Sequence, residues 1–393
     1  VRPFNLVEKG NPMIYLDNAA TTMTKPQSVI DAVCAAMTSF GGVGRGVHPA
    51  SLSAAMSVYE TREAIAQLFN APDASRVSFA ANATQALNTA INGLALPGSD
   101  HVITTYASHN SVLRPLYHLN EIYGNGIAAV KIAPDGSLDI GALERAFESR
   151  TRLVVVTHAS NLTGDIYDVA AISEVAHAYG ARVVLDVAQT AGVEPIDMQA
   201  MGIDALCFTG HKGLFGPQGT GGIVLAEGVE CEPLIVGGTG THSFDMEHPT
   251  DMPERLEAGT LNSHGIAGLG AGVRFIQETG VDKIAAHDRM LAQRFCDGLE
   301  CIPGAKHYGG AIADRTGIVA MNLGDVDSAI VADALANQYG ICTRAGAHCA
   351  PLMHKAIGTE GQGAVRFSFG WFNTTDDVDA ALQALEHIAA SLR

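Results

Sequence analysis

Residues 206–217 read LCFTGHKGLFGP and contain the lysine around which the chain is organised. An apolar run ends in Thr-Gly-His-Lys, and a glycine and proline turn follows. The pattern predicts a buried strand with Lys212 in the loop that follows its carboxyl end. A lysine withdrawn from water is driven toward the free amine, which can form a Schiff base with a carbonyl compound. The alternative is a surface lysine in a glycine turn.

A second apolar run, VVLDVAQ at residues 183–189, ends in a carboxylate. It predicts a buried parallel strand that delivers Asp186 at its carboxyl end, where α/β sheets bind their ligands. An aspartate opposite a Schiff-base lysine is the arrangement that pyridoxal phosphate (PLP) requires. The carboxylate keeps the pyridinium nitrogen protonated and so preserves the electron sink of the ring.

The DVAQ and TGHK motifs together resemble the class V aminotransferase superfamily, and most nearly its cysteine desulfurase and selenocysteine lyase branch. The resemblance runs from YLDNAATT at residues 15–22 to FNT at residues 372–374, which is most of the chain. It implies an α/β protein of the fold-type I PLP architecture. A large domain with a mostly parallel seven-stranded sheet would be joined to a small α+β domain.

Length and composition agree with a folded protein of this size. The 393 residues leave room for two domains or for one large domain with an appendage, and 47% hydrophobic residues can form a sizeable core. No apolar run is long enough for a membrane span, and no signal segment opens the sequence. A net charge of −17 argues against binding to nucleic acid or to an anionic membrane.

The seven cysteines are scattered and odd in number, which favours a reducing cytoplasm over a disulfide framework. The cluster His348, Cys349 and His354 matches no zinc spacing, so no metal site is expected.

The domain organisation follows from composition and from the resemblance. Residues 1–12 are interpreted as a remnant of expression cloning, with a native N-terminal arm as the alternative. Residues 13–24 are expected to pack with the small domain, residues 25–262 to form the large PLP-binding domain, and residues 263–393 to form the small domain. Alternating strand and helix patterns predict a parallel sheet in the large domain. The predicted strands there are 77–80, 101–105, 127–132, 152–158, 182–186, 204–208 and 219–225.

A strand-to-helix turn at residues 80–84 is a ready phosphate site, because free backbone N–H groups and the helix dipole favour an anion. Thr84 is predicted to cap this helix with its hydroxyl group. The resemblance implies that the turn holds the PLP phosphate with help from Thr209 and His211. Ala83 stands where many relatives carry a second threonine, so Thr84 and the backbone would contribute more.

The resemblance assigns further roles around the cofactor. His109 is expected to stack on the pyridine ring and to act in proton transfer, although a histidine after a strand is more often structural. Asn161 is expected to bind the substrate carboxylate and a cofactor oxygen, and Gln189 the phenolic oxygen.

Two loops bear on the substrate and on a second subunit. Arg45 and His48, in a glycine-rich loop, contact either the substrate or a partner subunit, or merely cap the helix expected over 51–70. The long loop 237–262 has little periodicity and includes Thr260, which matches a family segment that reaches the phosphate of the partner subunit. This match predicts a homodimer.

Residues 344–351, RAGAHCAP, hold the feature that decides the reaction. A desulfurase needs a cysteine thiolate to attack the sulfur of the bound amino acid, and Cys349 is the candidate, with Arg344 and His348 as supports. The alternative is a buried structural cysteine. The short loop resembles group II desulfurases, which often depend on an acceptor protein to remove the persulfide. Arg366, on a predicted strand, suits a substrate α-carboxylate.

The expected reaction converts L-cysteine to L-alanine and leaves the sulfur on Cys349 as a persulfide. Selenocysteine lyase activity is the first alternative, because it needs the same scaffold and a different substrate. An aminotransferase in which Cys349 is incidental is the second, and a non-enzymatic binding role is the third.

Overall fold

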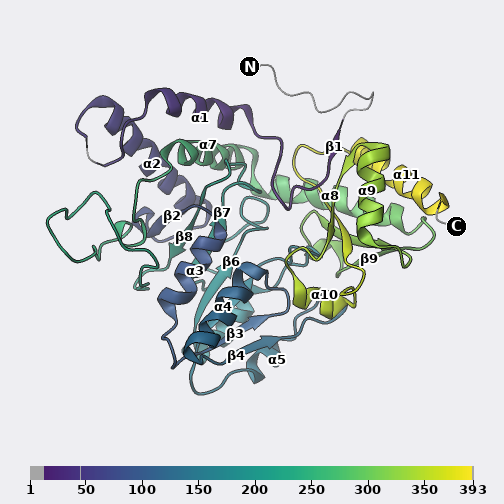
Figure 1. The fold of residues 1–393 in the computed structure, drawn as a ribbon, viewed down its shortest axis with the longest axis horizontal. Coiled ribbons are helices and arrows are strands. Elements are labelled where there is room, and N and C mark those ends of the chain that lie inside the picture. The colour runs from purple at the N-terminus through teal and green to yellow at the C-terminus, as the bar shows by residue number, and fades with distance from the viewer. Residues whose placement is uncertain (1–12, 45, 392–393) are drawn as a thin grey trace.

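The computed structural model describes residues 13–44 and 46–391, so the interpretations of residues 1–12 and the role predicted for Arg45 lie outside the described residues. Figure 1 shows a large body built on one sheet beside a smaller body that contains the C-terminal elements. The helices are α1 (Gln27–Ser39), α2 (Pro49–Leu68), α3 (Ala83–Leu94), α4 (Asn110–Tyr123), α5 (Ile140–Arg145), α6 (Val169–Ala178), α7 (Ser263–Thr279), α8 (Val281–Leu299), α9 (Ser328–Tyr339), α10 (Pro351–Ile357) and α11 (Thr375–Ser391).

The large sheet has seven strands, and all but one run parallel. Only β8 is antiparallel to its two neighbours. In spatial order the strands are β2 (Val77–Ala80), β8 (Gly221–Leu225), β7 (Ala205–Thr209), β6 (Arg182–Asp186), β5 (Thr151–Thr157), β3 (His101–Thr105) and β4 (Ile127–Val130). The predicted fold class, α/β with a mostly parallel seven-stranded sheet, is confirmed.

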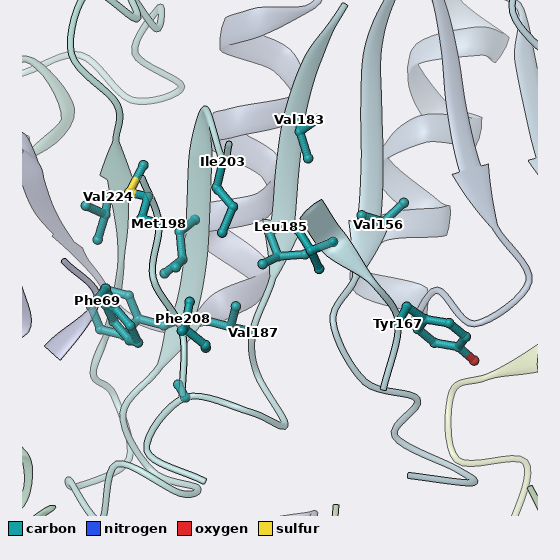
Figure 2. Packing of buried hydrophobic residues seen from close by; sticks show 14 of the residues in the cluster. Phe69, Val156, Tyr167, Val183, Leu185, Val187, Met198, Ile203, Phe208 and Val224 are labelled. Atoms are coloured by element: carbon teal, nitrogen blue, oxygen red, sulfur yellow. The ribbon is translucent and has the colours of Figure 1, made fainter. Parts of the chain in front are cut away.

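The strands of this sheet are continuous apolar runs because helices cover both of its faces. One face packs against α2, α6 and α7, and the other against α3 and α4. Figure 2 shows the first layer, with Leu185 of β6 between Val156 of β5 and Phe208 of β7. This packing fixes the carboxyl ends of β5, β6 and β7 side by side, which is where the polar residues follow.

The smaller body is built on an antiparallel sheet of four strands in the order β12 (Arg344–Gly346), β13 (Ala364–Ser368), β10 (Ile318–Leu323) and β9 (Ala305–Tyr308). The N-terminal strand β1 (Ile14–Tyr15) pairs in parallel with β11 (Ile341–Cys342). Leu16 is fully buried in the core of this smaller body. The start of the described chain is therefore tied to its last third.

Helix α7 packs with the large sheet rather than with the smaller body. Its side chains Ile266, Leu269, Val273 and Ile276 belong to the core that also contains β6 and β7. Helix α7 also packs against α1 and α2. We therefore propose that the domain boundary lies near Gly280, between α7 and α8, rather than at residue 263.

Candidate functional site

A cavity of about 220 Å³ lies at the carboxyl ends of β5, β6 and β7 and at the N-terminus of α3. It gathers nine of the ten residues that were predicted to bind the cofactor. These lining residues are Ala83, Thr84, His109, Asn161, Asp186, Gln189, Thr209, His211 and Lys212. These nine residues come from five separate segments of the chain and meet around one space, as the strand-end pattern in the sequence indicates.

Lys212 has a depressed pKa. Burial of the ammonium group, reinforced by the nearby charge of Arg366 and opposed by Asp186, lowers the pKa of Lys212 to about 8. The carbonyl oxygens of His211 and Lys212 both accept from the hydroxyl of Thr22 at 3.1 Å, which holds the lysine loop in place. A lysine that is fixed in place and readily loses its proton can act as a nucleophile or as a base.

Asp186 ends β6 and is 3% exposed. Within the described residues, its carboxylate accepts one hydrogen bond, from the N–H of Ala188 at 2.9 Å. Burial raises the pKa of Asp186, while the Ala188 N–H and the Lys212 charge oppose that rise. A carboxylate with so few partners would be stabilised by a bound cation placed against it.

The N-terminus of α3 forms one end of the cavity, but Thr84 does not cap the helix as predicted. Asn82 is the N-cap residue, and its side-chain oxygen accepts the N–H of Gln85 at 3.0 Å. Asn82 has the extended backbone of an N-cap position, and Asn is favoured over Thr there. Thr84 lies in the first turn, where its hydroxyl bonds that of Ser111 at 2.8 Å. Among the described residues, no acceptor meets the N–H groups of Ala83 and Thr84, as an anion site requires.

Two histidines of the cavity are uncharged at neutral pH. Burial and the charge of Lys212 lower the pKa of His109 to about 4, and the same two causes lower the pKa of His211 to about 4. His109 caps α4, and its Nδ1 accepts the N–H of Ser111 at 3.0 Å. The neutral ring therefore carries its proton on Nε2.

Two buried polar atoms of the lining have no partner within the described part of the chain: Oδ1 of Asn161 and Oγ1 of Thr157. Buried polar atoms without partners are costly unless a ligand or water satisfies them. Gln189 uses one N–H on the carbonyl of Ala19 at 3.2 Å, and Thr209 makes a long bond of 3.5 Å to the carbonyl of Thr220. The cavity is therefore built to receive a polar ligand.

Cys349 lies outside the lining of this cavity, yet its loop is tied to the cavity's edge. The carbonyl of His348 accepts the side-chain N–H of Asn161 at 2.6 Å, and the carbonyl of Cys349 accepts the N–H of Asn110 at 2.8 Å. His348 and Cys349 have φ values of 51° and 55°, which ordinary side chains rarely adopt. Such an enforced backbone is typical of a functional loop.

His348 does not support Cys349 as a cation. Burial, with the charge of Arg366, lowers the pKa of His348 to about 3, so its ring is neutral at physiological pH. Its Nε2 lies 3.1 Å from the carbonyl of Arg344, to which it donates. The guanidinium of Arg344 is exposed and has no bonded partner among the described residues, so it remains the candidate positive charge near the thiol.

Arg366 is 1% exposed on β13. Its Nη1 donates to the carbonyl of Asn161 at 2.9 Å, and its Nη2 donates to Oδ1 of Asp17 at 2.8 Å. Among the described residues, no partner meets its buried Nε. The guanidinium is thus fixed beside a cavity residue and keeps its Nε–H for a ligand.

The remaining predicted residues lie apart from the cavity. His48 caps α2, and its Nδ1 accepts the N–H of Ser51 at 3.4 Å, so the capping alternative is observed. Thr260 is exposed beside a separate hollow that is also lined by Ala81 and Gln85. Its predicted contact with a partner subunit stays a prediction.

Four polar residues of the site were not predicted: Asn82, Ser111, Thr157 and Asp17. Two of them carry signals that sequence reasoning could have used. Asn82 is a favoured helix-capping residue directly after a strand, and Thr157 is the last residue of β5, in register with Asp186. Asp17 and Ser111 have no comparable local signal.

Within residues 13–44 and 46–391, no three or more His, Cys, Asp or Glu side chains lie close enough to hold a metal ion. None of the helices in that part of the chain combines the length and the apolar character that a membrane span needs.

Comparison with known proteins places these features in a family. The class-V aminotransferase family model matches residues 14–381. A probable cysteine desulfurase of Methanothermobacter thermautotrophicus is 36% identical over 383 residues, covering 96% of this chain and 94% of its own. A cysteine desulfurase of Klebsiella pneumoniae is 33% identical with the same coverage.

Solved structures agree with the relatives found by sequence. The apo cysteine desulfurase from Thermococcus onnurineus superimposes with a TM-score of 0.90 at 31% identity, covering 96% of this chain and 95% of that one. The cysteine desulfurase CsdA from Escherichia coli does so with a TM-score of 0.87 at 29% identity, covering 97% and 95%. The chain belongs to the class-V aminotransferase family, as its DVAQ and TGHK motifs predicted.

Proposed function

We propose that the protein is a PLP-dependent cysteine desulfurase that converts L-cysteine to L-alanine and leaves the sulfur on Cys349 as a persulfide. Relatives and structural neighbours over nearly the whole chain are named cysteine desulfurases, which supports this reaction over amino-group transfer. The observation that carries the proposal is the hydrogen bond between Asn161 and the carbonyl of His348, because it holds the loop that contains Cys349 at the edge of the Lys212 cavity.

The cavity fits PLP on three counts. Lys212 supplies an amine with a depressed pKa for the aldehyde carbon. Asp186 is a buried carboxylate that lacks a full set of partners, which suits a cationic ring nitrogen. The first turn of α3 offers unbonded N–H groups and the hydroxyl of Thr84 to a phosphate. The bound cofactor would supply an electron sink for the charge that develops on the substrate Cα.

The side chains of this protein then do the remaining work. Arg366 binds the substrate α-carboxylate through its unpartnered Nε, and Asn161 orients it with its free Oδ1. Lys212 Nζ takes the proton from the substrate Cα, for which a pKa of about 8 is well matched at neutral pH. His109 would stack against the ring of the bound cofactor, and its Nε2–H is available to donate. The Cys349 thiolate attacks the substrate sulfur. The S–S bond of the persulfide forms as the substrate Cβ–S bond breaks, and Cβ keeps that electron pair and takes up a proton, which leads to alanine.

We further propose that the active unit is a homodimer. Thr260 is exposed in this chain and lies outside the Lys212 cavity, which suits a role in the partner's site. Large apolar side chains are exposed on α1 and α2, among them Ile30, Met37, Leu52, Met56 and Tyr59, and a second subunit would cover them. A sulfur-acceptor protein and a reducing, cytoplasmic location complete the proposal, and the seven free cysteines fit that location.

Incubation with L-cysteine, with alanine and protein-bound sulfur measured together, tests the reaction. Equal amounts of both products in the first turnover are expected. Transfer of the amino group to a keto acid, without release of sulfur, would overturn the proposal in favour of an aminotransferase. Parallel turnover of L-selenocysteine separates the lyase alternative, which requires selenocysteine to be used and cysteine to be refused.

A further inference from the structure

The guanidinium of Arg366 already has a carboxylate beside it when no substrate is present. Oδ1 of Asp17 lies 2.8 Å from Nη2, and the side chains of Arg366 and Asp17 are 1% and 19% exposed. The two residues are 349 positions apart in the chain, so this pair exists only because the N-terminal segment crosses to β13. A buried arginine without a counter-ion would be costly, and Asp17 offsets that cost.

The backbone fixes Asp17 independently of the ion pair. Asp17 forms an isolated parallel bridge with Ser368, and its carbonyl oxygen accepts the hydroxyl of Tyr15 at 3.2 Å and the N–H of Ala20 at 3.1 Å. The carboxylate is attached to a rigid segment that also borders the cavity at Ala20. Its position is therefore set by the fold and does not depend on Arg366.

The pair uses only part of the arginine. Asp17 contacts Nη2 through one oxygen, the carbonyl of Asn161 takes Nη1, and Nε is buried without a partner. An incoming carboxylate that binds in a bidentate manner to Nε and Nη2 would share Nη2 with Asp17, whose Oδ1 uses one of the two N–H groups of that nitrogen. The two carboxylates would then compete for one positive charge.

Arg344 provides a second charge next to this pair. It is the direct register partner of Arg366 across β12 and β13, so the two side chains leave the sheet on the same face. Its guanidinium is exposed and unbonded among the described residues. Because Asp17 is partly exposed, its carboxylate can pair with Arg344 when a ligand binds Nη2 of Arg366.

We propose that Asp17 is a specificity-determining residue. It is a counter-ion that weakens the binding of any ligand carboxylate to Arg366, and it thereby sets how strongly the site prefers amino acids to plain amines. The inference rests on the proposed function only in that Arg366 is taken as the carboxylate-binding residue. Asp17 balances the charge of the empty site and yields Nη2 to the α-carboxylate when an amino acid enters. Loss of its charge leaves Arg366 free for a ligand carboxylate.

The test compares two ligands in the PLP-loaded protein, L-alanine and ethylamine, which differ by the carboxylate. Calorimetric titration gives the dissociation constant of each for wild type and for Asp17→Asn. The variant should bind L-alanine more tightly and should not bind ethylamine more tightly, so that the preference for L-alanine rises about tenfold. Asp379→Asn, which alters an exposed ion pair with Arg294 far from the cavity, is the matched control and should leave the preference unchanged.

A purely structural role for Asp17 would weaken or preserve both affinities in parallel, and an unchanged ratio of the two constants would overturn the inference. Because neither ligand carries sulfur, the ratio can be measured even if L-cysteine turns out not to be a substrate. If the wild-type protein binds L-alanine no better than ethylamine, Arg366 is not the carboxylate-binding residue, and the inference about Asp17 is then wrong as well.

Thermal unfolding of Asp17→Ala gives a second readout that does not require the cofactor. The shortened side chain leaves room beside Arg366, so added formate should restore part of the lost melting temperature by replacing the missing carboxylate. Chloride at the same ionic strength should restore less. Equal rescue by both salts, or none by formate, would contradict a carboxylate-specific position at Arg366.

Discussion

Lys212 should titrate near neutrality in the PLP-free protein. With a pKa of about 8, Lys212 is a free amine in half of the molecules at pH 8. A lysine with an ordinary pKa near 10.4 is only about 0.4% free amine at that pH. The difference corresponds to on the order of 3 kcal/mol of preference for the neutral form. It arises mainly from burial, with a smaller contribution from Arg366.

Competitive labelling of the PLP-free protein with an amine-specific anhydride at a series of pH values, followed by peptide mass spectrometry, measures this titration. Lys283, exposed on α8, is the internal control. The Lys212 midpoint should lie about two pH units below the ordinary lysine value near 10.4. Asp186→Asn should lower it further, since the Asp186 charge opposes the depression, and Arg366→Gln should raise it. A Lys212 midpoint that coincides with that of Lys283 would refute the reasoning.

The sign of the accompanying pH dependence follows from linkage. The folded-state pKa of Lys212 lies below its unfolded value, so the unfolded chain binds more protons between about pH 8 and pH 10.4. The contribution of Lys212 to the free energy of unfolding should therefore rise with pH across that window. Lys212→Met should flatten this part of the profile, as measured by urea unfolding of the PLP-free protein.

The remaining predictions concern the thiol, the subunit contact and a buried ion pair. Cys349→Ser should keep PLP and its spectral response to L-cysteine while alanine release collapses, because a hydroxyl is not ionised at neutral pH; loss of PLP would point to a structural role. A mixture of Lys212→Ala and Thr260→Ala chains should regain activity that neither has alone, and its absence would count against a shared site. Glu257→Ala should cost about 3–5 kcal/mol in urea unfolding, because it strands the buried guanidinium of Arg62, now held at 2.6 Å.

The parts of the site that are set by local chemistry could be predicted from the sequence. Asp186, Thr209 and Lys212 sit at or just after the carboxyl ends of buried strands, and an apolar run that stops at a polar residue is visible without a structure. The seven-stranded sheet follows from the same alternation of apolar strands and helices.

The parts that depend on contacts between distant segments could not be predicted. The pairing of Asp17 with Arg366 and the bond from Asn161 to His348 join residues far apart in the chain, and no local pattern encodes either. The packing of α7 on the large sheet reflects which side chains it meets rather than where it falls in the sequence.

Short elements escaped prediction for a related reason. Helices α5 and α10 and strand β9 are between four and seven residues long, too short to show a clear period. Strands β11 and β12 are separated by a single residue yet belong to different sheets, because β11 pairs with β1 and β12 pairs with β13.

Mass spectrometry of the peptide that contains Cys349, taken after a single turnover of the PLP-loaded protein with L-cysteine and without reductant, tests the central claim most directly. The desulfurase account predicts that this peptide alone gains the mass of one sulfur atom, in step with the alanine released. Alanine release with Cys349 unmodified, or sulfur found on another of the seven cysteines, would contradict it.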